Sequence, residues 1–133
     1  MLRKYILFIL AAICISCLSS CSNPADSGED IRSRITGKTF VYEGEGFGGD
    51  FTIEIKEDGS FSYYEGALSS YIGMGKWTLD GDILCLSDSE RGGMPLVNYF
   101  RVDENDLVFL AEDSSGFAIV EVSEGERFSG RDQ

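Results

Sequence analysis

The sequence predicts an all-β fold: one small antiparallel up-and-down meander of about eight strands that forms a closed or nearly closed barrel. Two observations predict this class. From Ile35 onward no apolar pattern with a helical period persists. Instead, short runs rich in aromatic and β-branched residues alternate with clusters of Gly, Asp, Asn and Ser. Residues 35–133 are enough for one small domain and not for two.

The strands follow from period-2 alternation. Phe51, Ile53 and Ile55 fall on one face of their segment, and polar residues fall on the other, which is typical of a strand with one buried face. Turn residues such as those at 57–60, 80–82 and 103–106 separate such segments. We expect strands at 38–43, 51–57, 60–65, 75–79, 83–87, 98–103, 107–111 and 117–122, with Phe128 packing back against them. Tight turns favour a meander that removes its edges by closing into a barrel. Because alternation does not distinguish closure from stacking, a two-sheet β-sandwich remains the alternative.

The N-terminus has the pattern of a signal peptide at residues 1–20. Arg3 and Lys4 precede an uncharged apolar run at 6–18, and the small residues Ser19 and Ser20 end it. The run is shorter than the roughly 20 apolar residues of a membrane-spanning helix. A cleaved export signal is therefore the preferred interpretation.

Leu18-Ser19-Ser20-Cys21 resembles the lipobox of bacterial lipoproteins. The resemblance implies cleavage before Cys21 and a lipid anchor on that cysteine, a diacylglycerol and palmitate. It also implies a location in the bacterial cell envelope, with the domain on the outer side of the membrane, in the periplasm or at the cell surface. Two acyl chains give stable membrane attachment, whereas one is marginal.

Cysteine usage agrees with this interpretation. Cys14 and Cys17 leave with the signal peptide and Cys21 carries the lipid, so Cys85 remains as the one free thiol. The mature chain then has no intramolecular disulfide. Because Cys85 lies between two leucines, we expect it to be buried and unreactive.

A polar segment, residues 21–34, follows the expected cleavage site. Apart from Ile31 it contains almost no large apolar residue, and it includes Pro24 and Gly28. Such a composition does not bury a core, so we expect a flexible tether between the lipid and the domain at 35–133.

The charge balance restricts the partners. Removal of Arg3 and Lys4, two of the 11 basic residues, takes the net charge from −12 to −14, because the signal peptide contains no acid. This surface disfavours nucleic acid and anionic lipid. It would attract a cationic partner, and the alternative explanation of the acidity is solubility alone.

A second resemblance concerns the domain. The segment Gly37-Lys38-Thr39-Phe40 is similar to the Gly-x-Trp of a first lipocalin strand, with Phe40 in place of the Trp. The run GKWTLDGDIL at 75–84 is similar to a hairpin of lipocalin-like β domains in bacterial lipoproteins. The resemblance implies a lipocalin-like barrel.

The residue types argue against catalysis. The chain has no histidine, which removes the commonest general base and the usual transition-metal ligand. The acidic residues are concentrated at turns, where Asp is favoured for backbone reasons. We therefore expect no enzyme activity, no metal site and no cofactor.

One uncharged stretch, residues 66–75, is long for a hairpin connection. If it forms the rim of a barrel, it brings apolar side chains to the entrance of a ligand site. The candidate ligand-binding residues are Tyr71, Ile72, Met74, Trp77 and Tyr63. The alternative is a lid that packs on the core and binds nothing.

Together these features predict a non-enzymatic, membrane-anchored binding module for a small apolar ligand or an envelope protein. An inhibitor of a cationic enzyme such as lysozyme, and a structural or sensory envelope subunit, are the alternatives. A solid core with acidic loops at one end would favour the cationic protein partner.

Overall fold

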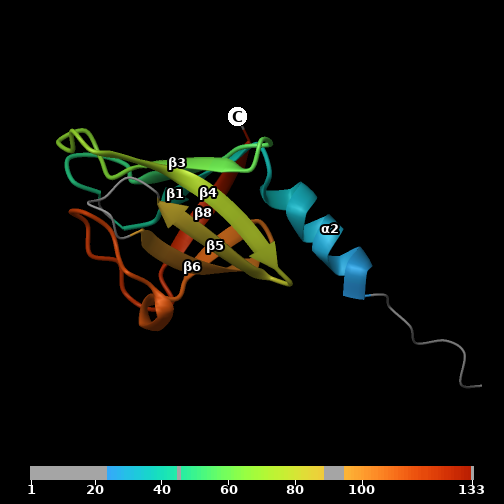
Figure 1. Cartoon of the computed structure of the whole chain (residues 1–133). Coiled ribbons are helices and arrows are strands. Elements are labelled where there is room, and N and C mark those ends of the chain that lie inside the picture. Colours follow the sequence, from blue (N-terminus) through green and yellow to red (C-terminus); the bar gives the residue numbers. More distant parts are fainter. Residues whose placement is uncertain (1–23, 45, 89–94, 133) are drawn as a thin grey trace, which may run out of the picture.

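The protein is an eight-stranded antiparallel barrel in which every strand pairs with its neighbours in the chain and β8 closes on β1 (Figure 1). The computed structural model describes residues 24–44, 46–88 and 95–132. The strands are β1 (Lys38–Tyr42), β2 (Thr52–Ile55), β3 (Ser60–Tyr64), β4 (Ile72–Asp80), β5 (Ile83–Asp88), β6 (Leu96–Asp103), β7 (Asp106–Phe109) and β8 (Arg127–Asp132). A helix, α2 (Pro24–Ile35), precedes them, and a short 3-10 helix, η1 (Ala111–Asp113), follows β7. The predicted closed up-and-down barrel is confirmed, and the sandwich alternative is not what forms.

Alternation along the strands sorts side chains between the interior and the outside. In β2 and β3 the buried residues Ile53, Ile55, Phe61 and Tyr63 alternate with half-buried polar or aromatic ones. Burial of these apolar side chains stabilises the barrel by roughly 1.5–3 kcal/mol each.

Aromatic rings occupy the barrel interior. The ring centroid of Phe51 lies 4.8 Å from that of Phe117 and 5.1 Å from that of Phe128. Phe100 lies 5.2 Å from Phe109 and 5.4 Å from Phe128. Most of these pairs are tilted or edge-to-face, arrangements that aromatic rings prefer. An eight-stranded barrel is narrow enough for side chains to fill it, and these rings do so.

The two ends of the barrel differ. The turns after β2, β4 and β6 are short, and we call this end the turn end. The turns after β2 and β4 match the predicted Asp-Gly pattern, with Gly59 (φ 83°) and Gly81 (φ 60°) in the left-handed region that glycine favours. The turn after β6 has no glycine, and Glu104 (φ 56°) adopts this conformation there. The described residues of the connections at 43–51, 65–71 and 110–126 lie at the opposite end, which we call the loop end (Figure 1).

The eighth strand is not where the sequence pattern placed it. Residues 117–122 form no strand; β8 is Arg127–Asp132, which includes Phe128. The apolar run at 117–122 instead crosses the loop end, and its backbone donors find partners outside any sheet. Gly130 makes the true strand possible, because a Cβ there would lie 2.0 Å from the carbonyl oxygen of Asn105.

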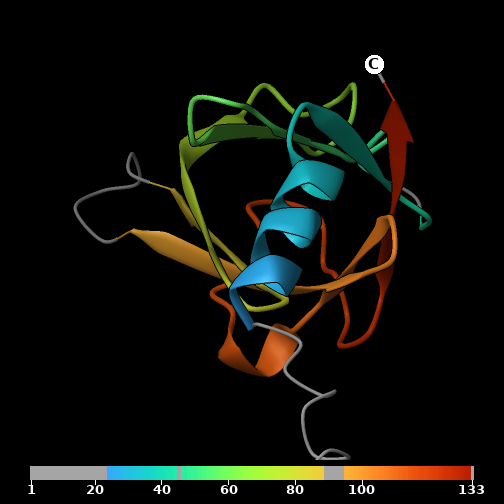
Figure 2. The ribbon, with the colours of Figure 1, turned by 90° about the vertical axis from the view of Figure 1, so that its right-hand side faces the viewer.

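The flexible tether predicted at 21–34 is also wrong over residues 24–34, which belong to α2; residues 21–23 lie outside the described part of the chain. Ile31 and Ile35, four residues apart, fall on one helix face and pack against the core, where Ile35 is fully buried. The Arg34 guanidinium donates a hydrogen bond to the Glu104 carbonyl in the β6–β7 turn. Figure 2, which faces the turn end, shows α2 lying across it. The helix forms because the barrel covers its apolar face.

Cys85 differs from expectation as well. Its neighbours Leu84 and Leu86 point into the barrel and are buried, so alternation puts Cys85 on the outer face, where it is partly exposed. In a strand with one buried and one exposed face, the residue between two buried leucines lies on the exposed face.

Among the residues that the structure describes, no helix has the length and apolar character needed to cross a membrane.

The role of α2 as the cover of the turn end is testable. Ile35→Ala removes a fully buried side chain from the core, so we expect a loss of about 2–5 kcal/mol in the free energy of unfolding, measured with urea. Ile72→Ala removes a half-exposed side chain of the same size and is the matched control. Equal effects of the two substitutions would show that α2 does not pack on the barrel.

Candidate functional site

The five predicted ligand-binding residues do not form one rim. β4 begins at Ile72, so Ile72 and Met74 point outward and are half-exposed, whereas Trp77 points inward. Trp77 lies towards the turn end: its Nε1 donates to the Lys56 carbonyl (2.9 Å), and the Arg32 guanidinium lies 4.5 Å from its ring centroid. Tyr71 and Tyr63 remain together at the loop end.

Tyr71 and Tyr63 meet at a buried carboxylate. The Tyr71 hydroxyl donates to Asp88 Oδ2 at 2.7 Å, and the Tyr63 hydroxyl lies 3.5 Å from the same oxygen. Burial, followed by the nearby Tyr71 and Asp88, raises the pKa of Tyr63 well above its usual value. Sequence analysis missed Asp88, which ends β5, because its partners are 17 and 25 residues away.

Glu65 is the second buried carboxylate, and it lies just after β3 with no exposed surface. It accepts hydrogen bonds from three consecutive backbone N–H groups: those of Ala118 (3.2 Å), Ile119 (2.8 Å) and Val120 (2.9 Å). Hydrogen bonds to a charged acceptor are worth more than neutral ones, at about 1.5–3 kcal/mol each. These contacts give the 117–122 run its backbone partners in place of a neighbouring strand.

The same residue also joins the β1–β2 connection to its own connection, residues 65–71. The Phe47 N–H donates to the Glu65 carbonyl (2.7 Å), and the Leu68 N–H donates to the Phe47 carbonyl (3.0 Å). Gly66 (φ 111°) allows this crossing, because a Cβ there would lie 2.5 Å from the Phe47 carbonyl oxygen. Three loops distant in sequence are therefore hydrogen-bonded at or next to Glu65.

Further contacts hold the β7–β8 connection, residues 110–126, over the loop end. Asn98 is buried and exchanges two hydrogen bonds with Gly116, at 2.9 and 3.1 Å. Next to Gly116, the Phe117 ring enters the aromatic core, 5.3 Å from Tyr63 and 5.4 Å from Phe109 between centroids. Phe117 therefore fills the barrel interior at the loop end, although it belongs to a connection and not to a strand.

Three large apolar side chains are exposed on the loops that meet at Glu65. They are Phe47 (46% exposed), Leu68 (69%) and Ile119 (46%), and we call them the apolar triad. Their backbone groups make the hydrogen bonds that join the loops, so the backbone that carries the triad is held in place.

The loop end is acidic. The described residues of the connections at 43–51, 65–71 and 110–126 include no Lys or Arg. Arg91, in the 89–95 connection, lies outside the described residues. The exposed acids of these connections are Glu43, Asp50, Glu112, Asp113, Glu121 and Glu124. By contrast, Arg127, the first residue of β8, forms ion pairs with Asp103 and Asp106. Of the exposed acids, Asp50 is three residues from Phe47 and Glu121 is two residues from Ile119, and the described residues of the same connections include no cation that would neutralise them.

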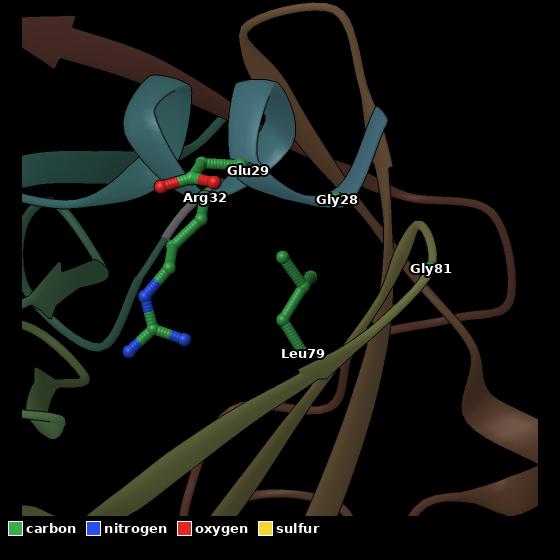
Figure 3. A pocket seen from close by; sticks show the side chains of 5 residues that line it. All are labelled: Gly28, Glu29, Arg32, Leu79 and Gly81. Atoms are coloured by element: carbon green, nitrogen blue, oxygen red, sulfur yellow. The ribbon is translucent and has the colours of Figure 1, made fainter. Parts of the chain in front are cut away.

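A cleft of about 300 Å³ lies at the turn end between α2 and the β4–β5 hairpin (Figure 3). Its lining residues include Glu29 and Arg32 from the helix and Leu79 from β4. The cleft is open and mixed in polarity. The Arg32 guanidinium already lies over the Trp77 ring. We therefore interpret this cleft as part of the contact between α2 and the barrel and not as a ligand site.

The buried carboxylates are bonded within the protein. Glu65 and Asp88 are the buried carboxylates of the core, and both accept hydrogen bonds from the protein itself. Within the described ranges, no group of three or more Cys, Asp or Glu side chains is arranged to hold a metal ion.

No family model, curated protein or solved structure matches this chain.

The role of Glu65 can be tested by Glu65→Gln. The amide keeps one acceptor oxygen but turns a donor towards backbone N–H groups, so we expect the free energy of unfolding to fall by about 2–3 kcal/mol. Elastase should also cleave faster within 117–122, as detected by mass spectrometry. The control is Glu121→Gln, an exposed change of equal charge on the same connection, with an expected effect within about 0.5 kcal/mol. If the two variants behave alike, Glu65 does not hold the connection.

The environment of Tyr63 predicts a dependence on alkaline pH. Its folded-state pKa is raised above the unfolded value of about 10, so above that pH the folded state binds more protons than the unfolded state. The stabilisation is therefore complete below about pH 10 and is lost as the pH rises further. In an ultraviolet titration, one tyrosine should ionise only on unfolding. Tyr63→Phe should abolish this late titration, and Tyr64→Phe should preserve it.

Proposed function

We propose that this protein is a membrane-anchored binding module of the bacterial cell envelope, attached through lipid on Cys21, that binds a protein partner at its loop end. The lipobox-like Leu18-Ser19-Ser20-Cys21 supports the anchor, together with the charged and apolar segments that precede it. The domain acts without catalysis, in keeping with a chain that has no histidine.

One observation carries the choice of a protein partner: the barrel interior is filled and both ends are covered. Rings occupy the centre, α2 covers the turn end, and the β7–β8 connection covers the loop end. A lipocalin-type ligand needs an open cup of roughly 300 Å³ or more inside the barrel. The filled interior therefore favours recognition on the outer surface over a small apolar ligand.

The acidic loop end favours a basic partner. Charge complementarity speeds association and rejects partners of like charge. A cationic enzyme is one class of basic partner. Binding at the loop end would then inhibit that enzyme.

The position of α2 agrees with a lipid at Cys21. Cys21 is three residues before Pro24, a stretch of chain that spans at most about 10 Å. Because α2 lies on the turn end, the loop end is the end of the barrel away from that helix (Figure 1). In our proposal the anchor holds the turn end near the bilayer and leaves the loop end free to bind.

The anchor is tested by metabolic labelling of bacterial cells with a fatty-acid analogue. The wild-type protein should carry the label and remain with membranes, and Cys21→Ser should lose both. Cys17→Ser, a substitution of the same kind inside the apolar run, should keep both. Label that persists on Cys21→Ser would refute the anchor.

A further inference from the structure

We infer that the apolar triad and its acidic surroundings form a docking surface for a basic amphipathic segment of a protein, one that combines Lys or Arg with large apolar side chains. This inference rests on the proposed function only for the statement that a protein partner exists. It adds where that partner binds and which residues it must bring.

The first argument is the fixed arrangement of the triad. Ile119 is held through its N–H on the Glu65 carboxylate, and Phe47 through its N–H on the Glu65 carbonyl. Leu68 is bonded to Phe47 through the backbone, and its side chain lies against Gly48, where a Cβ would come within 2.3 Å of Leu68 Cγ. Because the protein has already ordered these loops, a partner pays little of that ordering cost.

The second argument is exposure. Large apolar side chains with 46–69% of their surface in water gain free energy when a partner covers them. Apolar anchors near the centre of an interface, with polar residues around them, are the usual arrangement of strong binding sites. Here the triad supplies the apolar anchors, and the exposed acids nearest to it in sequence are Asp50 and Glu121.

The third argument is charge. Glu121 is exposed two residues after Ile119 on the β7–β8 connection, and Asp50 is exposed three residues after Phe47 on the β1–β2 connection. No described Lys or Arg belongs to these connections. This charge attracts a basic segment and repels an anionic lipid surface, so we assign the triad to a protein and not to a membrane.

The chain supplies a matched control surface. Ile72 and Met74 are also exposed and apolar, but they lie on the outer face of β4, where the next outward residue is Lys76. A purely hydrophobic attraction would use either surface. A basic amphipathic segment should use the triad alone.

The experiment uses the soluble chain from residue 21 with Cys21→Ser, which keeps every residue that the structure describes. Three fluorescent peptides of equal length serve as probes: one of Leu and Lys, one of Ser and Lys, and one of Leu and Glu. Binding is measured by fluorescence anisotropy at low and high salt. Vesicles of phosphatidylcholine, with and without phosphatidylglycerol, test the membrane as occupant.

We expect the Leu–Lys peptide to bind the parent chain and Ile72→Ser/Met74→Ser equally well. Phe47→Ser/Leu68→Ser/Ile119→Ser should bind it at least about tenfold more weakly. The Ser–Lys peptide should bind weakly and only at low salt, and the Leu–Glu peptide should not bind.

A second variant keeps the test valid if the triad variant unfolds. Asp50→Asn/Glu121→Gln retains the triad and changes only exposed side chains. It should bind the Leu–Lys peptide more slowly and with a smaller dependence on salt.

Several results would overturn the inference: no binding of the Leu–Lys peptide, equal loss in the β4 control, no effect of the charge variant, or triad-dependent binding to vesicles. A protein that carries lipid on Cys21 but fails these tests would leave the proposed anchor intact. Peptide binding by a chain that is not lipidated in cells would leave the docking surface intact and refute the anchor.

Discussion

The buried carboxylate of Glu65 joins the loops of the loop end. Glu65 accepts the N–H groups of Ala118, Ile119 and Val120, and its own carbonyl accepts the N–H of Phe47. A charge with no exposed surface is costly unless hydrogen bonds replace its water, and here three backbone donors do so. The same bonds satisfy a stretch of backbone that has no strand to pair with. These hydrogen bonds thus replace the water of a buried carboxylate and satisfy the backbone donors of residues 118–120. They also fix the positions of the loops around Glu65.

The consequences extend from this carboxylate to the interior. Because the β7–β8 connection is held across the loop end, Phe117 is directed into the ring cluster. At the other end Ile35 enters the core from α2. A barrel of this size holds either side chains or one small ligand, and this one holds side chains. Under the proposed function, recognition therefore uses the outer surface, where the apolar triad is exposed.

The sequence was sufficient for the parts of the fold that local patterns determine. Alternation such as that of Ile53 and Ile55, and the turns at Gly59 and Gly81, predicted seven strands near their observed places and the closed meander. The eighth strand was misplaced because residues 117–122 have a strand-like composition. Their backbone N–H groups bond to Glu65, which is more than 50 residues away in sequence. No local pattern reveals such a contact. The helix was missed because only Ile31 and Ile35 carry its apolar face.

The candidate site was less predictable for a related reason. The stretch 66–75 was expected to be a loop, but β4 begins at Ile72, and strand alternation then separates Met74 from Trp77. A shift of the strand start thus decided which side chains point outward. The apolar character of the region was recognised, but its partners Phe47 and Ile119 come from loops that only the closed barrel brings together.

Amide hydrogen exchange of the wild-type protein, resolved to single residues by NMR, tests the central interaction most directly. We expect the N–H groups of Ala118, Ile119 and Val120 to exchange far more slowly than those of an exposed loop, although they belong to no strand. Protection should fall together at all three positions in the Glu65→Gln variant, in which an amide replaces the carboxylate that accepts these N–H groups. Exchange at the rate of an unprotected loop near neutral pH would contradict the role of Glu65 and, with it, the ordered docking surface.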